Sequence, residues 1–184
     1  RFDTLDVFTA DLPEMTPTRV GGKYRLLGGA DLDEEQRASW AAIIAYIEQF
    51  RAADLVVLST PMWNFSIPYR LKHYIDIIVQ PRYLFKYTAQ GAVGLADKTR
   101  MVVIAARGSD YPPDSQAATF DYQEPYLRTI FGFVGITDIT FVKAEPLDAL
   151  GPDVTAQVLK RASMELTGLA ATLKACLCAT VRAE

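Results

Sequence analysis

The hydrophobic residues of this chain follow two different spacings. Continuous apolar runs at 55–58, 101–105 and 139–142 are typical of strands buried on both faces of a parallel sheet, and Leu5–Phe8 is a fourth, strand-like run. Between these runs, apolar residues recur every three or four positions, as they do on one face of a helix. Strands that alternate with helices predict βαβ units and a mostly parallel sheet, so the expected fold class is α/β.

Four segments carry the helical spacing. The first follows a capping box expected at Asp31 and Glu34, and the second follows a cap at Ser66 with Pro68 in its first turn. The third opens at Pro125 and stops at Gly135, and the last starts at Gly151-Pro152. Their apolar faces are Trp40, Ile43, Ile44, Ile47; Leu71, Tyr74, Ile75, Ile78; Leu127, Ile130, Phe131, Val134; and Val158, Ala162, Leu166, Leu169, Leu173, Leu177.

Two segments depart from this alternation. Residues 9–30 are rich in proline and glycine, which predicts a long surface loop. Residues 83–95 predict a small hairpin inserted between a helix and a strand. Its aromatic residues Tyr83, Phe85 and Tyr87 recur at every second position, so we expect them to share one face.

The composition narrows the class of protein. Of the 184 residues, 50% are hydrophobic and 22% are charged, which excludes a disordered, collagen-like or coiled-coil chain, and the length predicts a single domain over residues 1–184. A net charge of −3 without a basic run argues against nucleic-acid and anionic-membrane partners. Cys176 and Cys178 are too few and too close for a disulfide framework and are expected to be packing thiols, so we expect a cytoplasmic protein. No apolar run approaches the roughly 20 residues that span a bilayer.

Ligands of open parallel sheets bind beyond the carboxyl ends of the strands, which directs attention to the loops at 60–66, 107–113 and 145–151. The loop at 60–66 is aromatic and leads into a helix. The loop at 107–113 contains Arg107, which brings charge, and Gly108, which allows close approach of the backbone to a ligand.

The aromatic loop suits a flat, electron-poor ring. Met62, Trp63 and Phe65 can wall such a ring, while backbone N–H groups bind its polar edge. The alternative is that these three side chains only anchor the loop on the core.

The usual catalytic motifs are missing from the sequence. It contains no G-x-G-x-x-G, no G-x-x-x-x-G-K-[ST] and no G-x-S-x-G pattern. Its single histidine, His73, has no second histidine beside it, which removes most metal sites and catalytic triads. We expect His73 to be an ordinary helix residue, and we expect neither a metal site nor a catalytic acid or base.

The aromatic loop and the helix after it resemble the signature of the FMN-dependent NAD(P)H azoreductases and quinone reductases, which are flavodoxin-like proteins. The resemblance starts with Pro-Met-Trp-Asn-Phe-Ser-Ile-Pro at 61–68. Further matches follow in order at Leu71-Lys72, Tyr74-Ile75-Asp76, Phe85-Lys86-Tyr87-Thr88, Gly91, Gly94-Leu95, Arg107-Gly108, Pro125-Tyr126-Leu127, 131–136 and Ala144-Glu145. The resemblance covers nearly the whole chain and implies a flavodoxin-like three-layer sandwich with a mostly parallel sheet.

The resemblance also implies roles for individual residues. Positions that line the isoalloxazine ring of FMN or contact its pyrimidine side are Pro61, Met62, Trp63, Asn64, Phe65, Ala106, Arg107, Gly108 and Ser109. Tyr87 and Phe133 match aromatic residues that shape the substrate pocket, partly from a second subunit, because the family is homodimeric. Family members commonly have Ser-Arg-Gly-Gly where this chain has Ala106 and Ser109 around Arg107-Gly108.

By the same resemblance, the protein is an enzyme that accepts a hydride from NADH or NADPH at flavin N5. It then passes two electrons to a quinone, an azo compound or a nitroaromatic in ping-pong order. The charge of Arg107 is expected to stabilise the reduced, anionic flavin. Two alternatives stay open, namely a non-catalytic electron carrier and a cofactor-free flavodoxin-like module that binds a partner. A carrier usually has a strongly acidic face, and a net charge of −3 is modest.

The start of the chain departs from the family pattern. It opens at Arg1 rather than Met and enters the apolar run at 5–8 almost at once. The family's first strand and the Ser-rich loop that binds the FMN phosphate have no counterpart, and in the strand order 2-1-3-4-5 that first strand lies inside the sheet. We therefore expect the chain to be an N-terminally incomplete part of a larger flavoprotein, with roughly 30 to 40 residues before Arg1. The missing loop is also the best support for the cofactor-free alternative.

Overall fold

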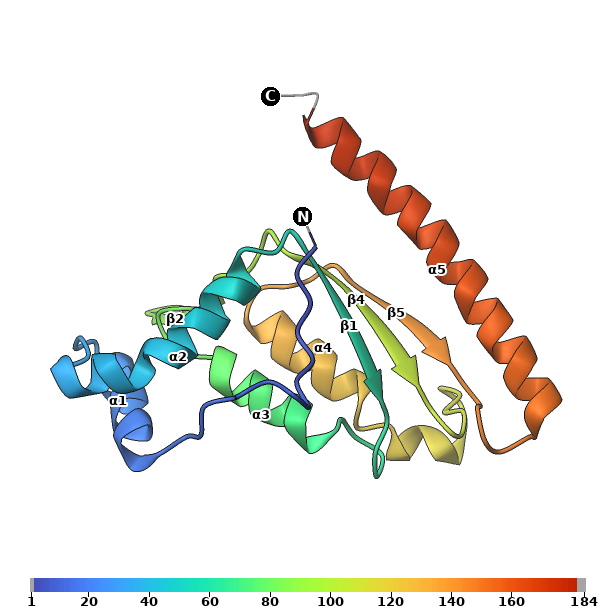
Figure 1. Cartoon of the computed structure of the whole chain (residues 1–184), viewed down its shortest axis with the longest axis horizontal. Coiled ribbons are helices and arrows are strands. Elements are labelled where there is room, and N and C mark those ends of the chain that lie inside the picture. Colours follow the sequence, from blue (N-terminus) through green and yellow to red (C-terminus); the bar gives the residue numbers. More distant parts are fainter. Residues whose placement is uncertain (1, 182–184) are drawn as a thin grey trace.

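Three parallel strands form the main sheet of the computed structural model, which describes the backbone of residues 2–181 and the side chains of residues 2–174. The strand order is β1–β4–β5, with β1 at Leu55–Pro61, β4 at Arg100–Ala106 and β5 at Ile139–Ala144 (Figure 1). Val57 lies opposite Val102, and Val103 lies opposite Phe141. The three long apolar runs therefore form the parallel sheet that the sequence predicts.

Helices cover both faces of this sheet (Figure 1). On one face lie α2 at Glu34–Arg51, α3 at Tyr69–Ile78 and α4 at Glu124–Phe133, and they share one apolar core with β1 and β4. On the other face, α5 at Pro152–Val181 buries Val158 and Ala162 against β5. This α/β sandwich confirms the flavodoxin-like fold class. Leu177, Cys176 and Cys178, which the sequence assigned to packing, lie outside the described side chains.

The predicted hairpin is present. It consists of β2 at Phe85–Thr88 and β3 at Gly91–Gly94, which pair in antiparallel fashion. The rings of Phe85 and Tyr87 contact each other with centroids 5.8 Å apart, as expected for one face. Tyr83 does not join them, because it precedes β2 and stacks on Trp40 at 6.3 Å. A Cβ atom on Gly94 would lie 2.2 Å from the backbone nitrogen of Gly135, so the hairpin meets the end of α4 backbone to backbone.

The fourth apolar run does not form the expected strand. The Asp6 carboxylate accepts a hydrogen bond from the Phe8 N–H at 2.9 Å, which folds this segment into a turn. A strand needs a partner for its backbone groups, and among the described residues β1 pairs with β4 alone. The segment instead lies along α3, where the Arg70 guanidinium donates to the carbonyls of Val7 at 2.7 Å and Ala10 at 2.5 Å.

The segment 9–30 is also not only a loop, because it contains α1 at Pro17–Leu27. Thr16 caps this helix, and the Trp40 indole of α2 donates to the Arg19 carbonyl at 3.1 Å. A Cβ on Gly22 would lie 2.6 Å from the Trp40 Nε1, so the glycine permits close packing of the two helices. Gly22, one of the glycines that suggested a loop, serves this packing instead. η1, a short 3₁₀ helix at Gln116–Phe120, precedes α4.

Two helix caps differ from the prediction. The capping box of α2 is formed by Asp33 and Gln36 rather than by Asp31 and Glu34. α3 begins after Pro68 with no side-chain cap, because Pro68 occupies the N-cap position and Ser66 lies two residues before it. Within the part of the chain that the structure describes, no helix combines the length and apolar character needed to cross a bilayer.

Candidate functional site

The loop after β1 (residues 62–66, the first loop) is a tight turn that presents its aromatic side chains outward. Trp63 and Ser66 exchange two backbone hydrogen bonds, of 2.9 and 3.0 Å. Between them, Asn64 and Phe65 have φ values of +47° and +70°, as in a type I′ hairpin turn. Phenylalanine rarely adopts this conformation, and such strain concentrates at functional sites. The side chains of Trp63 and Phe65 remain about half exposed.

The loop after β4 (residues 107–111, the second loop) is held from beneath by Arg107, whose side chain is fully buried. Its guanidinium Nη1 donates to Asp121 Oδ2 at 2.9 Å and to Glu145 Oε2 at 3.2 Å, and its Nε donates to Gln123 Oε1 at 2.9 Å. Gln123 in turn donates to the Pro61 carbonyl at 2.8 Å, at the end of β1. These four side chains, the Arg107 cluster, join the ends of β1, β4 and β5 to the start of α4.

The Arg107 cluster shows which groups the charge of Arg107 faces within the folded chain. Its positive charge faces the carboxylates of Asp121 and Glu145, which are both nearly buried, so it does not reach the ligand edge as a free cation. The second loop offers its backbone instead. The N–H groups of Gly108, Ser109 and the two residues after them have no hydrogen-bond acceptor among the described residues.

Gly108 lies directly against the loop after β5. A Cβ at this position would lie 2.9 Å from Asp148 Oδ2, and the Gly108 carbonyl accepts from the N–H groups of Asp148 and Ala149, both at 3.1 Å. The glycine therefore lets the loops after β4 and β5 meet. The first and second loops also meet, because the Met62 N–H donates to the Ala106 carbonyl at 2.9 Å.

The structure gathers all the predicted cofactor-binding positions at one edge of the sheet, where Pro61 and Ala106 are register partners at the ends of β1 and β4. It does not gather Tyr87 and Phe133 there. Phe133 ends α4, about 14 Å along the helix from Glu124, and its ring contacts Phe85 of the hairpin at 4.7 Å. The two predicted substrate-binding residues thus share a cluster through Phe85 at the far end of α4 from the loops.

Other aromatic residues at the loops were missed by sequence reasoning. The Phe120 ring lies 5.3 Å from the Phe65 ring, and the Tyr122 N–H donates to the Phe65 carbonyl at 2.9 Å. The Phe8 ring lies 5.5 Å from the Trp63 ring. These residues come from segments distant in sequence, so no local spacing connects them to the first loop.

A groove of about 470 Å³ lies beside the first loop. It is lined by Trp63, Asn64, Ser66, Ile67, Tyr69, Lys72 and Tyr126. Burial raises the pKa of Tyr126 to about 12, and the charge of Asp76 raises it in the same direction, so the Tyr126 hydroxyl is a proton-bearing donor at neutral pH. The Lys72 ammonium pairs with Asp76, with Nζ 2.6 Å from Oδ1.

His73 lies on α3 and faces the N-terminal segment, with its Nε2 3.1 Å from the Pro13 carbonyl. It therefore anchors that segment on the helix, in agreement with the ordinary role expected for it.

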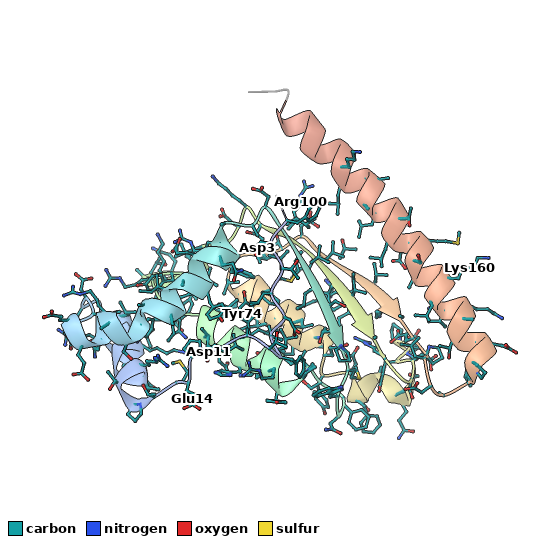
Figure 2. The ribbon with its side chains drawn as sticks, viewed as in Figure 1. Asp3, Asp11, Glu14, Tyr74, Arg100 and Lys160 are labelled. Atoms are coloured by element: carbon teal, nitrogen blue, oxygen red, sulfur yellow. The ribbon has the colours of Figure 1, made fainter. Side chains whose placement is uncertain are left out.

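Tyr74, the residue after His73, faces α2, and burial raises its pKa (Figure 2).

Comparison with known proteins gives the family. A model of the flavodoxin-like fold matches residues 1–167 of this chain. The chain belongs to the flavodoxin-like family. A flavodoxin-like relative from Nitratidesulfovibrio vulgaris (strain DP4), named FMN-dependent NADH:quinone oxidoreductase, is 45% identical over 161 residues, which cover 88% of this chain and 77% of the relative. A protein of the same name from Azospirillum brasilense is 37% identical over 176 residues, or 92% of this chain and 83% of that protein.

A solved flavodoxin-like structure is similar as well. It is an FMN-dependent NADH-azoreductase from Bacillus anthracis str. Ames Ancestor in complex with FMN, and it matches with a TM-score of 0.79 at 32% identity. The match covers 92% of this chain and 79% of that chain. The family resemblance stated from the residues of the first loop is therefore confirmed.

Proposed function

We propose that this chain is an FMN-dependent NAD(P)H oxidoreductase that reduces quinones and azo compounds. The observation that carries the proposal is the edge where β1 and β4 end side by side, with the Trp63 and Phe65 rings exposed next to backbone N–H groups that have no acceptor. The relatives named FMN-dependent NADH:quinone oxidoreductase support FMN as the cofactor and NADH as the donor.

The described residues fit the ring of FMN. The N–H groups of Asn64, Phe65, Gly108 and Ser109 have no acceptor in the described chain, and a flavin ring carries nitrogens and carbonyls that accept hydrogen bonds. The two loops do not supply a cation for the phosphate, because Arg107 is neutralised within the Arg107 cluster. We therefore assign the ring to these loops and the phosphate to groups outside them.

When bound, FMN supplies the two-electron hydride chemistry. The chain contributes orientation: the N–H groups of both loops bind the polar edge of the ring, and the aromatic side chains of the first loop shield it from water. The Arg107 cluster fixes the second loop, so its donors are positioned before the ligand arrives. The protonated Tyr126 hydroxyl donates a hydrogen bond to an oxygen of an acceptor in the groove.

We also propose that the acceptor pocket is completed by a second copy of the chain. Tyr87 and Phe133 lie at the far end of α4 from the loops, so they can wall a pocket over the first loop only when they come from a partner. A mixture of Trp63→Ala and Tyr87→Ala proteins, each impaired alone, is expected to recover activity because mixed dimers contain one unaltered pocket. No recovery, together with a monomeric mass in solution, would contradict a shared site.

The decisive experiment is FMN reconstitution of the purified protein followed by steady-state kinetics with NADH, NADPH and a naphthoquinone. We expect flavin absorbance, NADH oxidation that needs no partner protein, and parallel double-reciprocal lines. Flavin uptake with oxidation only in the presence of a partner would favour an electron carrier. A protein that takes up no flavin would favour a cofactor-free module. Cytoplasmic location stays a prediction, which cell fractionation tests.

A further inference from the structure

The groove beside the first loop has aromatic walls and one charge. Trp63, Tyr69 and Tyr126 supply rings, and Lys72 is the only charged residue in the lining. Its ion-pair partner Asp76 does not line the groove. A ligand in the groove therefore meets apolar faces, tyrosine hydroxyls and a cation, and the nearest carboxylate is that of Asp76, which pairs with Lys72 from outside the lining.

We propose that this groove is a subsite for planar aromatic electron acceptors that carry an anionic substituent, a sulfonate or carboxylate, and that Lys72 selects them. The inference rests on the proposed function, since it names the acceptor class of that same site. The aromatic body of the acceptor lies against the ring walls, and its anionic group lies on the Lys72 ammonium.

The ion pair of Lys72 permits this exchange. Lys72 and Asp76 are one helical turn apart on α3, and their side chains are 47% and 50% exposed. Exposed pairs of this kind hold together only weakly, so the anion of a ligand can replace Asp76 as the partner of Lys72. The Tyr126 hydroxyl on the same groove supplies a hydrogen-bond donor to the anionic oxygens.

The aromatic walls are preformed by the N-terminal segment. The Phe8 ring contacts the Trp63 ring at 5.5 Å and the Tyr69 ring at 6.2 Å, in both cases edge to face. Arg70 holds the backbone on both sides of Phe8 through the carbonyls of Val7 and Ala10. Trp63 and Tyr69 are therefore buttressed although both remain substantially exposed, and a ring can enter the groove without first ordering its walls.

The test compares two acceptors on the FMN-loaded protein, 1,4-naphthoquinone and its 2-sulfonate. The preference is the ratio of kcat/KM for the sulfonate to kcat/KM for the neutral quinone. We expect Lys72→Met to lower this ratio about two- to five-fold, and Lys72→Arg to retain it. Lys160→Met is the matched control, because Lys160 lies on α5, across the sheet from α3 (Figure 2), and we expect the ratio unchanged there.

Direct binding measurements on two variants make the outcome decisive. Calorimetric titration with the sulfonate is expected to show weaker binding in Lys72→Met and tighter binding in Asp76→Asn, with both differences shrinking at high salt. An unchanged ratio in Lys72→Met, or unchanged or weaker sulfonate binding in Asp76→Asn, overturns the inference. Failure of the proposed function has a different signature, namely no oxidation of NADH with the neutral quinone in the unaltered protein.

Discussion

The first and second loops lie side by side at the same edge of the sheet, yet they are held in opposite ways. The first loop is closed by its own backbone, through the paired bonds of Trp63 and Ser66, and its side chains project outward. The second loop is held by the buried side chain of Arg107, and its backbone donors have no acceptor among the described residues. One loop therefore contributes apolar surface to the edge, and the other contributes hydrogen-bond donors.

Because of this difference, we expect changes in the first loop to affect ligand binding and changes at Arg107 to affect the stability of the fold. The side chains of the first loop are about half exposed, so their removal changes what the edge can hold more than it changes the folded state. Arg107 pairs with two nearly buried carboxylates, so its removal takes the cation from Asp121 and leaves Glu145 with Lys143, 3.9 Å away. The following predictions run from the largest expected effect to the smallest.

Arg107→Met is expected to lower the free energy of unfolding by about 3–5 kcal/mol, because Asp121 and Glu145 lose their shared partner. Urea unfolding measures the loss. Lys72→Met is the matched control, since it breaks an exposed ion pair and should cost less than about 1 kcal/mol. Equal losses of unfolding free energy in the two variants would show that the Arg107 cluster stabilises the fold no more than an exposed ion pair does.

Asn64→Val is expected to cost about 1–3 kcal/mol, because a β-branched residue is strained at a φ of +47°. Asn64→Gly should be close to neutral, since glycine adopts this conformation freely. Urea unfolding of the pair tests whether the turn itself holds the first loop. If both variants unfold at the same urea concentration, the hairpin geometry does not matter for stability.

Trp63→Ala is expected to weaken FMN binding roughly two- to ten-fold while the free energy of unfolding changes little, because a half-exposed ring contributes more to a ligand than to the core. Titration of flavin fluorescence gives the affinity. Tyr24→Ala on α1 is the control, because it removes another exposed aromatic side chain from an element that does not line the site. Equal affinities in the two variants would remove Trp63 from the ring site.

The effect of alkaline pH comes last, because it is absent at neutral pH. Burial raises the pKa of Tyr126 to about 12, whereas an unfolded tyrosine titrates near pH 10. Above about pH 10 the unfolded chain releases a proton that the folded chain keeps, so this part of the stability is complete below pH 10 and is lost as pH rises toward 12.

Tyr126→Phe should therefore lose less stability than the unaltered protein between about pH 10 and pH 12. Some loss will persist, because burial also raises the pKa of Tyr74. Urea midpoints measured across this range test the difference, with the exposed Tyr122→Phe as the control. Identical slopes for the unaltered protein and Tyr126→Phe would contradict the raised pKa.

Much of the fold is readable from local spacing, because a buried parallel strand must be apolar at consecutive positions and a helix must be apolar along one face. The runs at 55–58, 101–105 and 139–142 satisfied this rule and formed β1, β4 and β5. The run at Leu5–Phe8 satisfied it less well, because Asp6 interrupts it, and it formed a turn instead, since a strand also depends on a neighbour elsewhere in the chain. α1 was missed for the converse reason, since its stability comes from Gly22 packing on Trp40 rather than from its own composition.

The candidate site likewise has a part that local sequence predicts and a part that only the fold brings together. Residues of the first loop stand together in the sequence, so their joint placement at a strand end was predictable. The partners of Arg107 come from 14, 16 and 38 residues away, and only the folded chain brings them to one guanidinium. Sequence reasoning therefore singled out Arg107, but it could not show that two carboxylates face its charge in the folded chain.

The two tryptophans of the chain occupy contrasting environments, with Trp40 fully buried beneath Tyr83 and Trp63 about half exposed at the edge of the groove. The tryptophan emission of the protein is consequently the sum of two contributions, one from each environment. A soluble quencher such as iodide should reach Trp63 and spare Trp40, so the quenched fraction follows events at the groove while the protected fraction follows the integrity of the core. One quenching titration can thus distinguish a change at the groove from unfolding of the protein.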